Sequence, residues 1–155
     1  MIIRITDEHI KDGKPDKEAL ALLGDDVVEI QGDKIIFNSD VGFSYCESLT
    51  SLEGATFNHR VLFRECNFLA SVADVIFNGD AELYWCESLA SVKNTTFNGN
   101  ADFLRCDSLA SVSGAVFNGD VDFWDCDSLT SVAGATFKKG FKAYPCPNLK
   151  QEELK

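Results

Sequence analysis

Apolar residues recur with one fixed period along most of this chain. The cysteines mark the period most clearly, since equal intervals separate Cys46, Cys66, Cys86, Cys106, Cys126 and Cys146. Cutting the sequence at Val41 yields five full coils, 41–60, 61–80, 81–100, 101–120 and 121–140, and a partial sixth, 141–149. With coil positions numbered 1 to 20, apolar residues occupy positions 1, 3, 6, 9, 12 and 17 of every full coil.

The pattern within a coil predicts a strand at its start. Positions 1 and 3 are apolar while positions 2 and 4 vary, which is the alternation of a half-buried strand. Asn-Gly pairs such as Asn98-Gly99 precede this strand and indicate a turn. Position 14 holds Gly, Asp or Asn, which tolerate a left-handed backbone and predict a second bend. Positions 6, 9 and 12 are three apart, a spacing that favours a loop or an extended arm.

A single coil of this kind cannot fold alone, because its six apolar side chains do not offset the conformational entropy lost when the whole coil becomes ordered. Stacked coils share their core, which is the principle of a solenoid. We therefore predict a repeat solenoid, mainly β, in which parallel strands stack in five to six coils over residues 41–149.

Residues 1–40 lack the repeat and are predicted to form a small α/β N-terminal cap. Residues 16–24 have the pattern of a short helix, with Asp16 as N-cap and Gly24 at its end. Residues 27–30 and 34–37 are predicted to form short strands. At the other end, two prolines at 145 and 147 and the polar tail 150–155 are expected to end the stack.

The combined pattern, V-x-F-x-x-C-x-x-L-x-x-V, resembles the leucine-rich repeat, with cysteine in the position that this family gives to asparagine or cysteine. Residues 118–132 resemble short bacterial repeats of the form G-D-L-x-L-x-x-C-x-x-L-x-x-L-P, although the proline after position 12 is replaced in every coil. The resemblance covers about residues 41–149 and implies a solenoid. The pentapeptide-repeat β-helix is the alternative, since a coil of this length also holds four pentapeptides; its inward positions would leave the invariant Leu and Phe pointing outward.

Charge and hydropathy narrow the classes of function. The formal net charge is −11, opposite in sign to that of a free-standing nucleic-acid binder. The sequence holds no run of 18 apolar residues, so we expect no transmembrane helix and no membrane partner. Acidic residues follow within the first eight positions, before a signal-peptide core could form, which predicts a cytoplasmic location.

The cysteines are predicted to be reduced, buried thiols. Equivalent positions of stacked coils lie about 4.8 Å apart in single file, so each internal cysteine would have two equal neighbours and no unique disulfide partner. A linear file of thiols does not converge on a zinc ion either. We therefore expect neither disulfides nor a metal site, and no cofactor.

Candidate catalytic groups are scarce. The two histidines, His9 and His59, fall in the cap and in a turn, and the sequence contains no phosphate-binding loop or nucleophile elbow. We therefore predict that the protein is not an enzyme and has no catalytic residue. Acidic residues bracket the strands and are interpreted as a solvated face, with a divalent-ion site as the weaker alternative: Asp80, Glu82, Asp102, Asp120 and Asp122.

Coil positions 2, 4 and 5 differ between coils while the apolar positions stay fixed, and they hold both tryptophans and all three tyrosines. Stacking would place these side chains on one face, where Tyr, Trp and Arg are typical of binding hot spots. The alternative is that the rings only cover neighbouring coils. The candidate protein-binding residues are Tyr45, Arg64, Glu65, Tyr84, Trp85, Arg105, Trp124, Asp125 and Tyr144.

We therefore predict a protein-binding module, an inhibitor or immunity-type protein whose partner is another protein, basic in charge, without direct contact to nucleic acid. Its acidity would accelerate association with such a partner. The alternative is an acidic mimic of nucleic acid that blocks a DNA- or RNA-handling enzyme. A homodimer is also consistent with the pattern.

Overall fold

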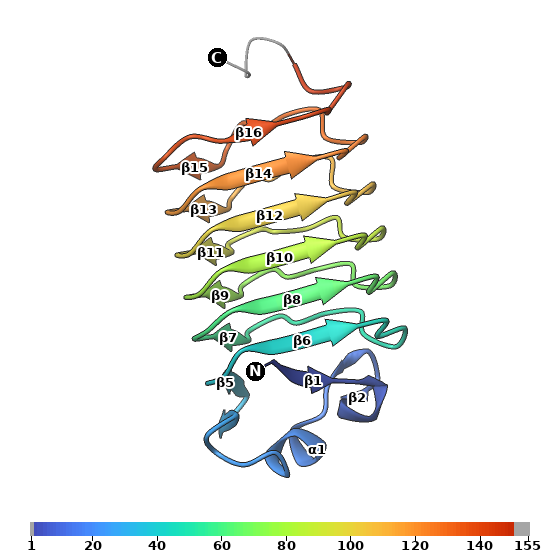
Figure 1. The fold of residues 1–155 in the computed structure, drawn as a ribbon, viewed down its shortest axis with the longest axis vertical. Helices are drawn as coiled ribbons and strands as arrows, with labels where there is room; N and C mark the ends of the chain where they lie inside the picture. Colours follow the sequence, from blue (N-terminus) through green and yellow to red (C-terminus); the bar gives the residue numbers. More distant parts are fainter. Residues whose placement is uncertain (1, 151–155) are drawn as a thin grey trace.

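The computed structural model describes residues 2–150, which form a stack of parallel β-coils, as Figure 1 shows. Strands of adjacent coils pair with a shift of one full coil, for example Val41 with Val61 and Ala81 with Ala101. The predicted fold class, a mainly β solenoid of stacked parallel coils, is thus confirmed.

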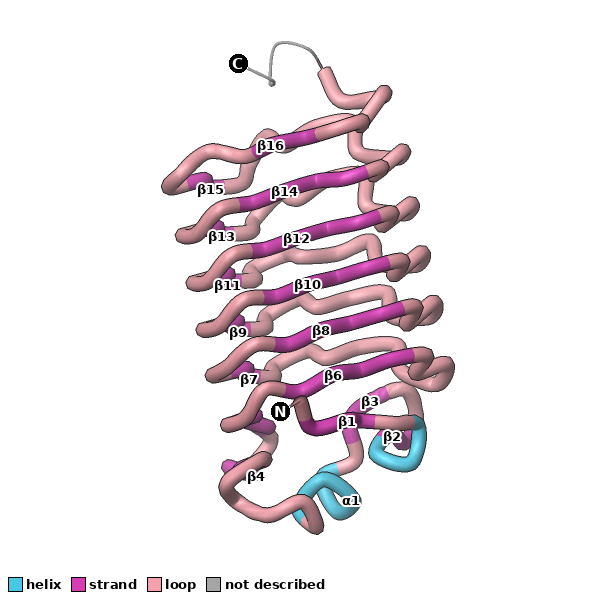
Figure 2. Tube along the Cα trace, viewed as in Figure 1, coloured by secondary structure: helices cyan, strands magenta, loops and turns pink. Residues whose placement is uncertain are grey.

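Two sheets of mainly parallel strands run along the stack. The first, here called the long-strand sheet, has the order β1 (Ile3–Ile5), β6 (Val41–Ser44), β8 (Val61–Arg64), β10 (Ala81–Tyr84), β12 (Ala101–Leu104), β14 (Val121–Trp124) and β16 (Lys142–Ala143). The second, the short-strand sheet, has the order β15 (Thr136–Phe137), β13 (Val116–Phe117), β11 (Thr96–Phe97), β9 (Ile76–Phe77), β7 (Thr56–Phe57), β5 (Lys34–Phe37) and β4 (Val28–Gln31). Turns and loops make up the rest of each coil, as Figure 2 shows.

Residues 2–40 lie at the N-terminal end of the stack and extend both sheets. Strand β1 pairs in parallel with β6, and the antiparallel pair β4–β5 joins the short-strand sheet. Helix α1 (Lys17–Ala21) begins at Asp16, whose carboxylate accepts the backbone N–H of Glu18 at 3.2 Å, as the sequence predicted. The 3₁₀ turn η1 (Asp7–His9) and the hairpin β2 (Ile10–Lys11) and β3 (Lys14–Pro15) were not predicted.

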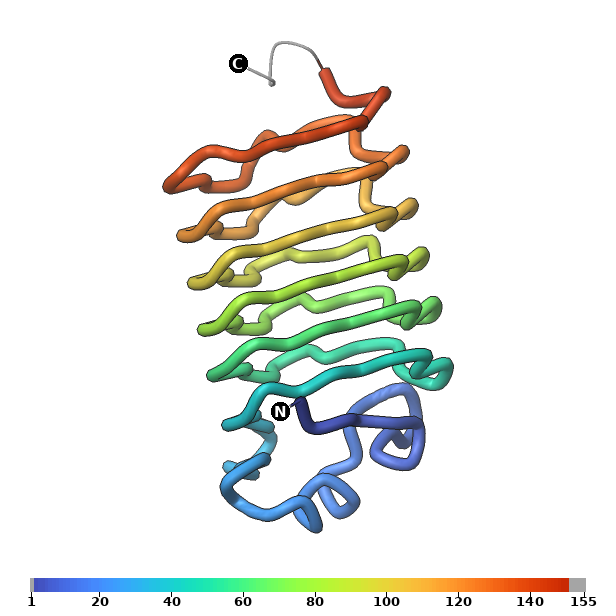
Figure 3. Tube along the Cα trace, in the orientation of Figure 1, coloured from blue at the N-terminus to red at the C-terminus, as the bar shows by residue number. Residues whose placement is uncertain are grey.

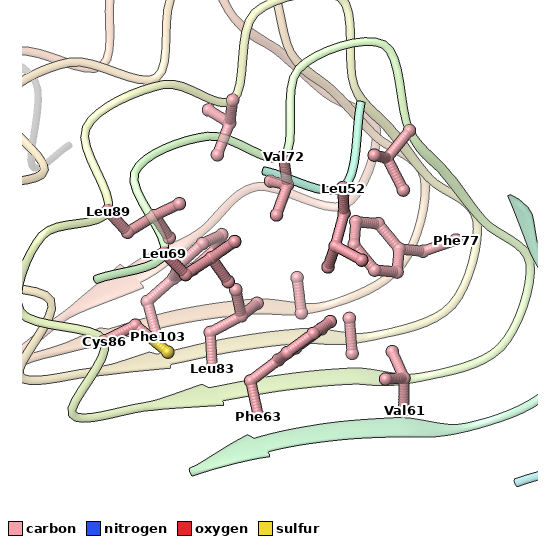
Figure 4. Packing of buried hydrophobic residues seen from close by; sticks show 14 of the residues in the cluster. Leu52, Val61, Phe63, Leu69, Val72, Phe77, Leu83, Cys86, Leu89 and Phe103 are labelled. Carbon is pink, nitrogen blue, oxygen red and sulfur yellow. The ribbon is translucent and has the colours of Figure 1, made fainter. Parts of the chain in front are cut away.

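The core lies between the two sheets and the loop arms that join them. Figure 4 shows Phe63, Leu83 and Cys86 of the long-strand side facing Leu69 and Val72 of the arms. The position 17 phenylalanines stack ring on ring through the molecule, with centroids 4.6 to 5.3 Å apart from Phe37 to Phe137. The invariant leucines at position 9 are fully buried, as are the phenylalanines from Phe37 to Phe117. This contradicts the pentapeptide-repeat alternative, in which both would point outward.

The coils turn where the chain passes between the two sheets, which can be followed in Figure 3. Position 14 has the predicted left-handed backbone, with φ from +58° at Asn94 to +85° at Gly114. Position 19 is glycine in the three middle coils, although Gly79 and Gly99 do not have a positive φ. A Cβ on Gly99 would lie 2.5 Å from the carbonyl carbon of Gly79, so it is the neighbouring coil that excludes a side chain.

The asparagines at position 18 form a ladder beside this turn. The side-chain amide of Asn58 donates to Asn38, and the contact repeats in each coil up to Asn118, with distances of 2.8 to 2.9 Å. Pro145 and Pro147 follow the last strand, β16. Of the predicted polar tail 150–155, residues 151–155 lie outside the described part of the chain.

Candidate functional site

The predicted binding residues gather on the outer face of the long-strand sheet and at the ends of its strands. Positions 1 and 3 are buried in the core, so positions 2 and 4 point to the opposite face. Register places Tyr84 beside Arg64 on one side and beside Leu104 on the other. Trp124 is the next neighbour of Leu104. The position 5 residues follow directly after these strands: Tyr45, Glu65, Trp85, Arg105 and Asp125.

Two groups of aromatic contacts form on this face. The guanidinium of Arg64 lies 5.9 Å from the ring centroid of Trp85, within cation–π range. Trp124 and Tyr144 meet edge to face, with centroids 5.9 Å apart and an interplanar angle of 82°. Trp124 is 40% exposed and Tyr144 69% exposed. Trp124 and Tyr144 therefore contact each other and still leave much of their surface exposed.

Tyr84 is embedded between carboxylates. Its hydroxyl oxygen lies 3.2 Å from Oε1 of Glu82 and 3.2 Å from Oδ2 of Asp102. Burial and these two negative groups raise the pKa of the Tyr84 phenol, which therefore stays protonated and able to donate. Burial also raises the pKa of Asp102, although its hydrogen bond with Tyr84 acts in the opposite direction. The other oxygen of this carboxylate, Oδ1, is buried without a hydrogen-bond partner.

Position 5 has an unexpected backbone conformation. All five residues have a positive φ, between +52° and +56°, although none of them is glycine. The stacking imposes this geometry, because the amide of Tyr45 donates to the carbonyl of Arg64 at 2.8 Å and that of Trp85 to Leu104 at 2.7 Å. For residues with a Cβ the left-handed conformation costs about 1 to 2 kcal/mol each. The sequence pattern gave no signal for it, since Tyr, Glu, Trp and Arg are not typical of such positions.

Acidic residues form two borders along this face. From Asp80 to Asp127 every acidic residue lies at coil position 20, 2, 5 or 7: Asp80, Glu82, Glu87, Asp102, Asp107, Asp120, Asp122, Asp125 and Asp127. Positions 20 and 2 make the first border, at the start of the strands, and positions 5 and 7 make the second, at their ends. The short-strand sheet carries none of them in this range.

The first border lines a shallow cavity of about 360 Å³ whose acidic walls are Asp80, Glu82, Asp102, Asp120 and Asp122. At its N-terminal end Arg60 pairs with Glu82, with a nitrogen–oxygen distance of 2.6 Å. In the second border, burial raises the pKa of Asp107; Arg105 opposes that shift, and Asp127, Glu87 and Asp125 add to it. Within residues 2–150, no group of three or more His, Cys, Asp or Glu side chains is placed to hold a metal ion.

The cysteines form the predicted file of reduced thiols. All six are free, and all except Cys146 are buried. The Cys66 thiol donates to the carbonyl of Phe43 in the preceding coil at 3.3 Å, and that of Cys106 to Leu83 at 3.4 Å. Burial raises the pKa of Cys106 to about 12. These thiols are therefore structural groups that satisfy carbonyls of the long-strand sheet.

Sequence reasoning missed one exposed aromatic residue. Phe68 is 57% exposed and stands at coil position 8, where every other full coil has serine. The signal that identified positions 2, 4 and 5 was available here too, since Phe68 departs from an otherwise uniform column. A separate cavity of about 460 Å³ lies where the first coil meets the cap, between Lys14, Lys17 and Glu53, and none of the predicted binding residues lines it.

Comparison with protein-family models, with curated proteins and with solved structures finds no match for this chain. In the described part of the chain, no helix has the length and apolar character needed to cross a membrane.

Proposed function

We propose that this solenoid is a non-catalytic protein-binding module, and that its binding surface is the outer face of the long-strand sheet together with the position 5 column. One observation carries the proposal: bulky side chains are kept at a column whose backbone favours glycine. Strained residues of this kind cluster at functional sites, where the strain is retained for what the side chain does.

Position 14 of the same coil provides a comparison for position 5. Positions 5 and 14 are both left-handed, yet position 14 holds only residue types that suit such a backbone: Gly54, Asp74, Asn94, Gly114 and Gly134. At position 5, only Asp125 is of such a type. Folding alone would favour the same residues in both columns. The difference supports a role for Tyr45, Glu65, Trp85 and Arg105 outside the fold.

The charge of the face supports a basic protein as partner. Two acidic borders flank the aromatic residues, and the chain as a whole carries a formal net charge of −11. Such a field accelerates the encounter with a basic surface and discriminates against acidic ones. A small protein that occludes a basic partner in the cytoplasm acts as an inhibitor or immunity-type protein, and this is the role we propose.

We also infer that the coils are of the short leucine-rich type. The invariant Leu and Phe point inward, and the cysteine thiol bonds to the backbone from the position that the leucine-rich family gives to asparagine or cysteine. The chain lacks the proline that usually follows position 12, and its loop arms run as turns with isolated bridges between serines such as Ser51 and Ser71.

Capture of partners from a lysate of the source cells tests the proposed function. The wild type is compared with a face variant, Tyr84→Ala with Trp85→Ala and Trp124→Ala, and with a control on the short-strand sheet, Thr56→Ala with Ile76→Ala and Val116→Ala. We expect a basic protein that the wild type and the control retain and the face variant loses. Equal retention by all three contradicts the proposal. Retention of nucleic-acid enzymes by all three, abolished by moderate salt, would instead indicate an acidic mimic.

A further inference from the structure

The position 4 side chains of the last four coils form one continuous apolar stripe, here called the aromatic stripe: Tyr84, Leu104, Trp124 and Tyr144. Adjacent strands lie about 4.8 Å apart, so the stripe is about 15 Å long. It runs across the strands, parallel to the axis of the stack in Figure 1. About 10 residues of α-helix cover the same length.

The acidic borders flank the aromatic stripe on both sides. Glu82, Asp102 and Asp122 stand at position 2, two residues before the stripe on the same face of the sheet. The second border has one acidic residue at position 5, Asp125, where the preceding coil has Arg105, and continues with the acidic residues of position 7. The strands end at position 4, about 7 Å from position 2, and position 5 follows directly after them. An α-helix with its side chains is about 10 to 12 Å wide, so a helix on the stripe would reach both borders.

The direction of the stripe excludes strand addition as the mode of binding. The amide and carbonyl groups of β10, β12 and β14 already pair with their neighbouring strands, and a partner that adds a strand needs an exposed sheet edge. A partner that lies across these strands must bind through side chains. An amphipathic helix does this by laying its apolar face on an apolar surface.

One carboxylate of the first border already pairs with a cation of the chain itself. Arg60, at position 20, donates from Nε to Glu82 at 2.7 Å. In the following coils the residues equivalent to Arg60 are Asp80 and Asn100, which cannot play this role. Within residues 2–150, neither Asp102 nor Asp122 forms an ion pair, although Lys142 is the register neighbour of Asp122. Oδ1 of Asp102 is buried and its Oδ2 bonds Tyr84, so of the two carboxylates it is that of Asp122 which can accept a cation from outside the chain.

We propose, on the basis of the protein-binding function above, that the partner segment is a basic amphipathic helix. Its apolar side chains lie on the aromatic stripe, and its lysines or arginines reach the acidic borders on both sides. Asp122 receives a cation from one flank of the helix, as Glu82 receives Arg60. The carboxylates of positions 5 and 7 receive cations from the other flank.

Synthetic peptides of about 18 residues, long enough to form helix, test this class of partner. The first is a leucine–lysine helix with all leucines on one face; the second replaces each lysine with glutamate; the third keeps the composition of the first but spreads the leucines around the helix. Affinity is measured by fluorescence anisotropy in about 0.15 M salt, where charges beyond about 8 Å are screened. We expect the first peptide to bind and the other two to bind at least about tenfold more weakly.

Two charge-neutral variants locate the site. Leu104→Ser with Trp124→Ser removes the centre of the aromatic stripe, and Ile76→Ser with Val116→Ser removes two apolar side chains from the short-strand sheet. Thermal unfolding confirms that both fold. We expect the first variant to bind the leucine–lysine helix at least about tenfold more weakly and the second to match the wild type. A third variant, Asp122→Asn, should bind more weakly with a shallower salt dependence.

The inference is overturned if the stripe variant binds the leucine–lysine helix as tightly as the wild type, or if either control peptide binds as well. These peptides do not involve the natural partner, so the outcome is separate from that of the capture experiment. If the peptides fail while capture still depends on Tyr84, Trp85 and Trp124, the amphipathic class is wrong and the protein-binding function stands. If both fail, both proposals are wrong.

Discussion

The backbone amide of Trp85 donates to the carbonyl oxygen of Leu104 in the next coil at 2.7 Å, while Trp85 itself has a φ of +55°. The hydrogen bond between coils thus fixes a conformation that the residue would not adopt by preference. The same relationship repeats at Tyr45, Glu65 and Arg105. At position 5, therefore, the residue types present are not the ones that the backbone conformation favours.

Replacing Arg105 tests whether this strain is real. Arg105 is exposed, so its removal costs little packing. Arg105→Gly and Arg105→Ala remove the same charge, but only glycine lacks the Cβ that makes a positive φ unfavourable. We expect the glycine variant to be more stable than the alanine variant by about 1 kcal/mol, measured by chemical denaturation. Equal stability of the two variants would show that position 5 is not strained.

Gly99 should tolerate no side chain, although position 19 of the first and fifth coils holds His59 and Lys139. In Gly99→Ala the new Cβ would lie 2.5 Å from the carbonyl carbon of Gly79, a backbone atom that cannot move without shifting the coil. We expect a loss of at least about 2 kcal/mol in the free energy of unfolding, as for other substitutions that overpack a structure. Gly32→Ala is a comparison without a steric clash, since a Cβ there meets nothing within 4 Å, although its φ is +62°. A smaller loss at Gly99 than at Gly32 would contradict the close packing of the coils.

Stability should fall as the pH rises through the acidic range, and Asp102 should contribute to this. Burial raises the pKa of Asp102 in the folded state above its ordinary value of 3.8. The folded protein therefore binds a proton more tightly than the unfolded chain does. The resulting stability is fully present below the ordinary pKa and is lost as the pH rises through the raised one.

Thermal unfolding from about pH 4 to pH 7 measures this effect. We expect Asp102→Asn to be more stable than the wild type at neutral pH and to lose less stability across that range. Asp7 has the opposite effect on stability. The hydrogen bond from the Ser48 side chain lowers the pKa of Asp7, so its contribution to stability is lost as the pH falls. If Asp102→Asn leaves the pH profile unchanged, the carboxylate of the first border is not desolvated.

Much of the architecture could be predicted because the coils repeat. Six apolar positions defined the core, and residue types at position 14 identified a left-handed bend. Strand β1 was missed because Ile3 and Ile5 give only one alternation and their partner β6 lies far along the chain. The requirement for glycine at position 99 could not be predicted either, because it comes from the backbone of the neighbouring coil and not from the φ of Gly99 itself.

The differences between coils indicated which side chains would lie near one another. The structure places those of position 4 on the outer face of the long-strand sheet and those of position 5 just beyond its strand ends, but whether they bind a partner stays a prediction. The contact between Arg64 and Trp85 and the enclosure of Tyr84 by two carboxylates depend on the spacing of coils, which the sequence does not state. The positive φ of position 5 could not be predicted, because its residue types indicate the opposite.

A single variant, Tyr45→Gly with Glu65→Gly, Trp85→Gly and Arg105→Gly, tests whether the position 5 side chains are kept for binding. Its thermal midpoint and its capture of a partner from the lysate are measured beside those of the wild type. We expect the variant to unfold at a temperature no lower than the wild type and no longer to retain the partner. A variant that is equally stable and still retains the partner would contradict a binding role for these side chains.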